Sequence, residues 1–122
     1  MRNYLLAWIG PTLSLILLPT TAFSSPRAEI AWSMITEGAV LIDVRTEQEF
    51  KQEHLESALN IPLNEIISSG RIQFTKDQPI VLYCRTGNRS NIAKQQLIKQ
   101  GFTRIHNAGG LNEIRQLIAN KN

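Results

Sequence analysis

The sequence predicts an α/β fold in which parallel strands carry helices on both faces, a three-layer α/β/α arrangement. Short runs at 40–44, 58–61, 80–83 and 104–107 predict strands, and the first and third are apolar and β-branched. Helical segments separate these runs in chain order, and this alternation is typical of a parallel sheet. A length of 122 residues with 43% hydrophobic content suits one small domain.

Helices are predicted from apolar spacing and from residues that begin or end a helix. Thr46 with Glu49 three residues later predicts a capping box, and the short helix after it carries Phe50 into the core. A polar cap at Ser90 or Asn91 predicts a helix that ends at Gly101. Further helices are predicted over 28–37, over 64–69 with its end at Gly70, and over 110–118. The helical residues expected to face the core are Ile30, Met34, Ile35, Ile92, Ala93, Leu97, Ile98, Leu111, Ile114, Leu117 and Ile118.

Cys84, the only cysteine, lies between the strand at 80–83 and the next helix. At such a turn the free N–H groups of a helix start converge and favour negative charge. An ordinary cysteine is only about 3% thiolate at pH 7, and lowering its pKa by roughly two units makes about three quarters of it thiolate. The polar sequence after Cys84, with Arg85 and Arg89, predicts an exposed loop, which favours a reactive cysteine over a buried structural one.

Four blocks of the sequence resemble the rhodanese (sulfurtransferase) family. In chain order they are Asp43-Val44-Arg45 with Glu49-Phe50, His54-Leu55 with Ala58-Leu59-Asn60-Ile61-Pro62, the loop from Cys84 to Ser90, and Asn107-Ala108-Gly109-Gly110. The chain is most similar to the exported single-domain thiosulfate sulfurtransferases of the phage-shock type. It has Glu56-Ser57 where the family often has Pro-Gly.

The resemblance implies a rhodanese-like fold with a small parallel sheet of four to five strands, ordered second, first, third, fourth. The carboxyl ends of the neighbouring first and third strands would then bring Asp43 and Arg45 close to Cys84, where ligands of open α/β sheets bind. By resemblance, Cys84 carries a persulfide formed from thiosulfate or another small sulfur anion. The sulfur then passes to cyanide in an assay, or to a thiol or protein, and no cofactor is required.

The resemblance also assigns the surrounding residues. The expected substrate-binding residues are Arg85, Thr86, Gly87, Asn88 and Arg89, and the expected supporting residues are Asp43 and Arg45. Arg85 is expected to meet the anion, whereas Arg89 could bond loop carbonyls as readily as a ligand. His54 is expected to cap a turn or satisfy a buried group, and His106 belongs to no motif. Two separated histidines and one cysteine make no metal site.

Two alternative functions stay open. Cysteine phosphatases have five residues between the cysteine and the arginine, whereas four separate Cys84 from Arg89, which favours sulfur over a phosphoryl group. Rhodanese-like domains also serve as sulfur-relay or protein-interaction modules with little turnover of thiosulfate.

Residues 1–24 predict a signal peptide. Arg2 provides the positive charge, the apolar stretch 5–18 carries none, and Ala22-Phe23-Ser24 forms a plausible cleavage site. Cleavage predicts a periplasmic protein with a single rhodanese domain over 25–122, without a membrane segment; an uncleaved anchor is the alternative. The domain keeps 12 basic residues against 10 acidic ones, a formal +2 that does not indicate nucleic-acid binding.

Overall fold

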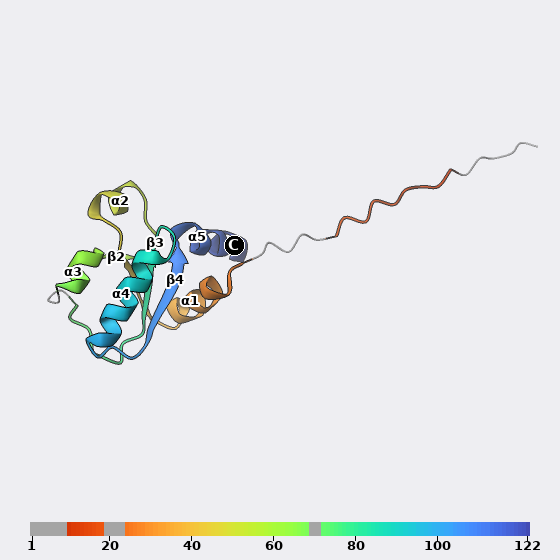
Figure 1. The fold of residues 1–122 in the computed structure, drawn as a ribbon. Helices are drawn as coiled ribbons and strands as arrows, with labels where there is room; N and C mark the ends of the chain where they lie inside the picture. The colour runs from red at the N-terminus through yellow and green to blue at the C-terminus, as the bar shows by residue number, and fades with distance from the viewer. Residues whose placement is uncertain (1–9, 19–23, 69–71) are drawn as a thin grey trace, which may run out of the picture.

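Four parallel strands form the centre of the part of the chain that the structure describes (Figure 1). The computed structural model describes residues 10–18, 24–68 and 72–122. The strands are β1 (Val40–Asp43), β2 (Leu59–Asn60), β3 (Ile80–Cys84) and β4 (Ile105–Gly110). Their order across the sheet is β2-β1-β3-β4, and every neighbouring pair is parallel. The expected strand order and sheet type are therefore confirmed.

Helices cover both faces of this sheet, which confirms the three-layer α/β/α fold. The helices are α1 (Pro26–Thr36), α2 (Glu47–Gln52), α3 (Leu63–Ile67), α4 (Asn88–Lys99) and α5 (Leu111–Lys121). One apolar cluster lies under α3 and α4, and a second lies under α1 and α5. Helix α2 has no buried residue and lies near the carboxyl ends of the strands (Figure 1).

Strand β3 is buried along its whole length because helices cover both of its faces. Successive side chains of a strand point to opposite faces. Leu82 and Cys84 accordingly belong to the cluster under α3 and α4, whereas Val81 and Tyr83 belong to the cluster under α1 and α5. The side chain of Cys84 is thus directed toward the start of α4.

Helix α1 begins earlier than the sequence predicts, because Ser25 caps it through the amide of Ala28. Ala28 and Ala31 are its buried residues, while Met34 and Ile35 pack at the edge of the cluster. The prediction that Ile30 faces the core is wrong, since its side chain is 52% exposed. Small alanines allow the helix to approach the sheet closely, and this leaves Ile30 on the outer face.

Helix α4 also begins earlier, at Asn88, after Gly87 in a left-handed conformation. Ala93 and Leu97 are buried as expected, but Ile92 and Ile98 are exposed, so their predicted core positions are wrong. Helix α5 begins at Leu111, since β4 continues to Gly110. The predicted end of α3 at residues 69 and 70 lies outside the described residues.

Phe50 lies outside both apolar clusters and is only partly buried, so its predicted place in the core is wrong. Its ring stacks on His54 with the centroids 3.8 Å apart. The predicted capping box is present: Thr46 Oγ1 accepts from the amide of Glu49, and the Glu49 carboxylate accepts from the amide of Thr46.

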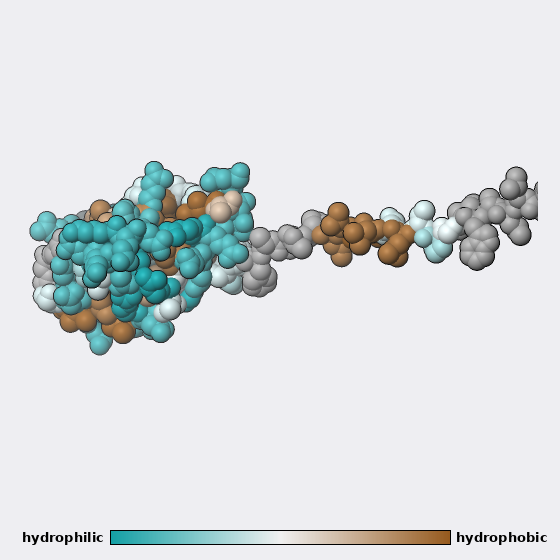
Figure 2. Space-filling model, turned by 90° about the horizontal axis from the view of Figure 1, so that it is seen from above, coloured by the Kyte–Doolittle hydropathy of each residue, from teal (hydrophilic) through white to brown (hydrophobic). Residues whose placement is uncertain are grey.

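Residues 10–18 lie clear of the domain and form neither helix nor strand (Figures 1 and 2). Leu13 is 91% exposed and Leu17 is 85% exposed. Within the described residues, no helix is long and apolar enough to cross a bilayer.

Candidate active site

Cys84 ends β3 at the carboxyl edge of the sheet. The pairing of β3 with β4 is irregular between Leu82 and Cys84, so that Cys84 lies beside Gly110 instead of continuing the regular register. The two ends of β3 and β4 therefore meet next to the loop that leads into α4. Seen from this end of the molecule, the surface is mostly hydrophilic (Figure 2).

The sulfur of Cys84 lies inside the loop. The amide of Gly87 donates to Sγ at 3.0 Å, and the Ser90 hydroxyl lies 3.4 Å from it. Gly87 has a φ of 101°, which favours glycine and turns its N–H toward the sulfur. Cys84 itself is buried, only 1% exposed, whereas Arg85 and Thr86 of the same loop are exposed, as predicted for the loop.

These contacts lower the pKa of the Cys84 thiol. Burial raises this pKa, but hydrogen bonds from the Ser90 hydroxyl and from the amides of Ser90, Thr86 and Gly87 outweigh it. A thiol with a lowered pKa supplies more thiolate, which is the reactive form of cysteine. The arrangement can therefore hold a nucleophilic sulfur in a water-poor ring of donors.

Ser90 is a buried residue of the site that the sequence analysis treated only as a helix cap. Its hydroxyl donates to Asn107 Oδ1 at 2.7 Å, a shorter contact than the one to Cys84. Asn107 in turn donates from Nδ2 to the carbonyl of Gly87 at 3.0 Å. The hydroxyl has a single proton and Asn107 is its nearer acceptor, so the amides contribute more than Ser90 to stabilising a thiolate.

Arg89 binds Glu49 of α2 rather than the loop carbonyls that the sequence analysis considered. Nη1 of Arg89 lies 2.7 Å from Oε1 of Glu49, and Nη2 lies 3.0 Å from Oε2. The hydrogen bond from Arg89 is the main cause that lowers the pKa of Glu49 to about 2. These two hydrogen bonds connect the first turn of α4 to α2, beside the loop that follows Cys84.

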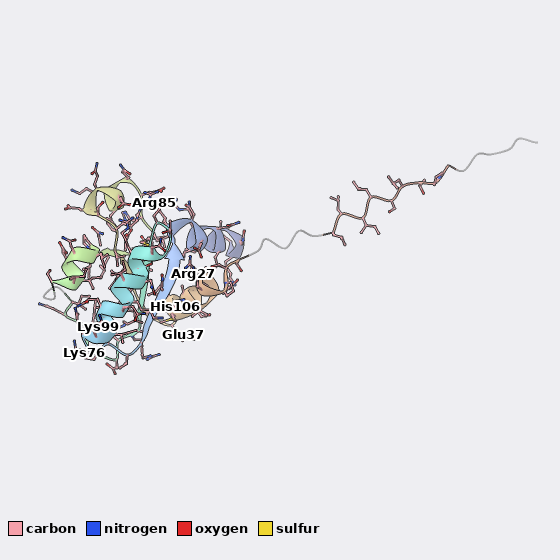
Figure 3. All side chains as sticks on the ribbon, viewed as in Figure 1. Arg27, Glu37, Lys76, Arg85, Lys99 and His106 are labelled. Atoms are coloured by element: carbon pink, nitrogen blue, oxygen red, sulfur yellow. The ribbon has the colours of Figure 1, made fainter. Side chains whose placement is uncertain are left out.

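Arg85 is the more accessible of the two loop arginines. Its side chain is 57% exposed, and within the described residues its ion pair is a long contact of 3.4 Å to Glu49. Figure 3 places Arg85 at the end of the sheet where α2 lies. Thr86 and Asn88, the other predicted binding residues of the loop, are exposed at the same end.

Asp43 and Arg45 form a fully buried ion pair, with Arg45 Nη2 at 2.7 Å from Asp43 Oδ2. Nη2 of Arg45 also donates to the carbonyl of Glu53 at 2.6 Å. This pair joins the end of β1 to the segment after α2, which suits a supporting residue. Removing one partner of such a pair leaves a buried charge, which typically costs about 3–5 kcal/mol.

Among the described contacts, the hydrogen bonds of both histidines go to backbone carbonyls and not to the sulfur of Cys84. Nδ1 of His54 is 2.8 Å from the carbonyl of Phe50, which caps the end of α2 as the sequence analysis considered. Nε2 of His106 is 2.7 Å from the carbonyl of Arg27.

Arg27, on the first turn of α1, is a part of the loop's surroundings that the sequence analysis missed. Its Nη2 donates to the carbonyl of Thr86 at 3.2 Å, and its Nε donates to Glu113 of α5 at 2.8 Å. Figure 3 shows Arg27 where α1, α5 and the end of β4 meet. No spacing in the sequence connects Arg27 with Cys84.

Comparison with known proteins identifies the class. The model of the rhodanese-like domain matches residues 27–117. The chain therefore belongs to the rhodanese family, which confirms the resemblance found in the sequence. All four sequence blocks, including the loop from Cys84 to Ser90, fall within the matched range.

Relatives and solved structures agree with this family. Thiosulfate sulfurtransferase PspE of Escherichia coli K12 is 41% identical over 76 residues, which cover 60% of this chain and 71% of that protein. Thiosulfate sulfurtransferase GlpE of Pseudomonas savastanoi is 32% identical over 90 residues, covering 74% of this chain and 84% of that protein. A rhodanese with anions from E. coli has a TM-score of 0.59 at 39% identity, covering 63% of this chain and 92% of that chain. The human single-domain sulfurtransferase TSTD1 has a TM-score of 0.64 at 26% identity, covering 78% of this chain and 95% of that chain.

Proposed function

We propose that this protein is a thiosulfate sulfurtransferase that carries sulfur as a persulfide on Cys84. The observation that carries the proposal is the ring of donors around the only sulfur nucleophile of the chain, with the amide of Gly87 3.0 Å from Sγ. The names of the relatives from E. coli and Pseudomonas support the same reaction.

The reaction takes place in two half-reactions. The Cys84 thiolate attacks the outer sulfur of thiosulfate, the S–S bond of thiosulfate breaks, and its electron pair leaves with sulfite. The loop amides stabilise the anionic terminal sulfur of the resulting persulfide. A nucleophilic acceptor, which is cyanide in an assay and a thiol or protein otherwise, then attacks that terminal sulfur and releases the thiolate.

A small anionic donor agrees with the burial and the charges of the site. Cys84 is 1% exposed, which favours a compact donor such as thiosulfate over a bulky one. Of the two loop arginines, Arg85 has more freedom to meet an incoming anion, because its side chain is 57% exposed and its pairing with Glu49 is long. The similar E. coli rhodanese, whose structure was solved with anions, supports a small-anion site.

A phosphatase reaction has weaker support. Phosphoryl transfer needs an arginine free to hold the phosphate oxygens, and the fork of Arg89 is bound to Glu49 instead. The loop has only four residues between Cys84 and Arg89, which also favours sulfur transfer over phosphoryl transfer.

The test is the formation of thiocyanate from thiosulfate and cyanide by the wild type and by Cys84→Ser. We expect the variant to lose the activity while keeping its circular dichroism spectrum, since serine fits the same space. Arg104→Ala is the control, because Arg104 is exposed and precedes β4 at the opposite end of the sheet. Residual turnover in Cys84→Ser would remove the persulfide mechanism. An inactive wild type would favour a relay or interaction module.

We also propose that residues 1–24 are a signal peptide that is removed on export, leaving residues 25–122 as the mature periplasmic domain. Ser25 caps α1 at the start of the folded domain, and residues 10–18 lie clear of it, which supports a boundary near Ser25. N-terminal sequencing of protein from the periplasmic fraction should find Ser25 or Phe23 first. Intact protein in the membrane fraction would contradict cleavage.

A further inference from the structure

Arg27 is held in place by α5. Its Nε donates to Oε2 of Glu113 at 2.8 Å, and its Nη2 forms an ion pair with the other carboxylate oxygen. The same carboxylate accepts from the Ser25 hydroxyl at 2.9 Å and from the amide of Gly110 at 3.2 Å. The Arg27 side chain is 41% exposed, and its contacts with the Glu113 carboxylate hold the guanidinium beside the loop.

From that place, Nη2 of Arg27 donates to the carbonyl oxygen of Thr86 at 3.2 Å. This carbonyl and the N–H of Gly87 belong to the same peptide group. In a trans peptide the C=O and N–H point in opposite directions, and the described chain has no cis peptide bond. While Arg27 holds the oxygen, the N–H on the other side is directed at Sγ of Cys84, 3.0 Å away.

Two glycines, Gly87 and Gly109, leave room for the guanidinium of Arg27. A Cβ at Gly87 would lie 2.7 Å from Nη1 of Arg27, closer than real Cβ contacts. A Cβ at Gly109 would overlap Nε and Cζ of the same side chain, and Gly109 has a φ of 89° that favours glycine. The two glycines therefore leave the space that Arg27 occupies.

We propose that Arg27 is a positioning residue of the sulfur-transfer site, which holds the Thr86–Gly87 peptide so that its N–H faces the sulfur of Cys84. The proposal rests on the proposed function only in taking Cys84 as the residue that carries sulfur. A flip of this peptide would instead direct a carbonyl oxygen at an anionic sulfur.

The charges around the loop agree with this role. The charged side chains around the loop are Arg27 of α1, Glu49 of α2, Arg85 and Arg89 of the loop and the start of α4, and Glu113 of α5. The buried pair of Asp43 and Arg45 lies at the end of the neighbouring strand β1. The hydrogen bond to Glu113 is the largest effect that raises the pKa of Arg27, and the negative charge of the Cys84 thiolate adds to it. Arg27 and the thiolate thus stabilise each other.

The test compares the mature protein with Arg27→Gln and with Arg104→Gln, which removes the same charge at the other end of β4. The ultraviolet absorbance of the thiolate is titrated against pH and corrected with Cys84→Ser. We expect the midpoint for Cys84 to rise by about one pH unit in Arg27→Gln, which is about tenfold less thiolate below the midpoint, and to stay unchanged in Arg104→Gln. Sulfur transfer by Arg27→Gln should fall by a similar factor near neutral pH and recover as the pH passes the new midpoint.

An unchanged midpoint in folded Arg27→Gln, or an equal rise in Arg104→Gln, would overturn the role of Arg27. Circular dichroism establishes folding, and if Arg27→Gln does not fold, Arg27→Lys takes its place. Lysine keeps the charge but cannot hold Glu113 and Thr86 with one planar fork, so a smaller rise is expected and a wild-type midpoint would refute the positioning role. The titration needs no thiosulfate, so its result does not depend on whether thiosulfate is the donor.

Discussion

The contact of Arg89 with Glu49 should stabilise the fold, and a double-mutant cycle can measure how much. The contact consists of two charge-assisted hydrogen bonds, of 2.7 and 3.0 Å. Each such bond is worth about 1.5–3 kcal/mol when fully buried. The side chains of Glu49 and Arg89 are 22% and 34% exposed, and solvent screening reduces the expected coupling to about 1–2 kcal/mol for the pair.

The cycle uses Glu49→Ala, Arg89→Ala and the double variant, with the free energy of unfolding measured by urea denaturation at pH 7. A second cycle with Arg85→Ala is the control, since the 3.4 Å contact of an exposed Arg85 should couple by less than about 0.5 kcal/mol. A coupling for Arg89 no larger than for Arg85 would refute the idea that Arg89 joins α4 to α2.

The same contact predicts a pH dependence. The hydrogen bond from Arg89, with smaller contributions from Thr46, lowers the pKa of Glu49 from 4.5 to about 2, so the folded state gains the full stability of this carboxylate above about pH 4.5 and loses it as the pH falls toward 2. Over that range the difference in stability between the wild type and Glu49→Ala should shrink. A difference that stays constant down to the lowest pH at which the wild type folds would contradict the assignment.

Two further predictions concern the anion and the thiolate. Arg85→Ala should raise the KM for thiosulfate about three- to tenfold with little change in kcat, because one partly screened contact of about 1 kcal/mol is lost; steady-state kinetics with unchanged KM would exclude Arg85 from anion binding. Ser90→Ala should raise the pKa of Cys84 by only about half a unit, because the hydroxyl lies closer to Asn107 than to the sulfur. A rise of about two units in the thiolate titration would mean that Ser90 donates mainly to Cys84.

The fold was predictable because short sequence patterns, such as apolar runs and helix caps, match the strands and helix starts of the structure. A continuous apolar run such as 80–83 occurs where helices cover both faces of a strand, and β3 is buried on both. Thr46 and Glu49 indicated a helix start, since a capping box depends on only four residues. The errors at Ile30 and Ile92 are alike: small residues, Ala28 and Ala31 in α1 and Ala93 in α4, face the sheet, and the isoleucines lie on the outer side of each helix.

The site was predictable in its central loop and, through the strand order, at Asp43 and Arg45. Cys84 and its neighbours are adjacent in sequence, so the sequence could show them together. Arg27, Ser90 and Glu49 reach the loop through tertiary packing or hold a second role there, and no sequence spacing reveals that. Gly109 was the nearest signal for Arg27, because a glycine near the end of a strand often marks a close approach by another group.

The persulfide on Cys84 is the central claim, and mass spectrometry of the mature protein tests it most directly. After incubation with thiosulfate, the intact mass should increase by one sulfur atom, fragmentation should place that sulfur on Cys84, and addition of cyanide should remove it. Cys84→Ser treated in the same way should gain no mass. A wild type whose mass stays unchanged after thiosulfate, or a gain of sulfur that persists in Cys84→Ser, would contradict the account.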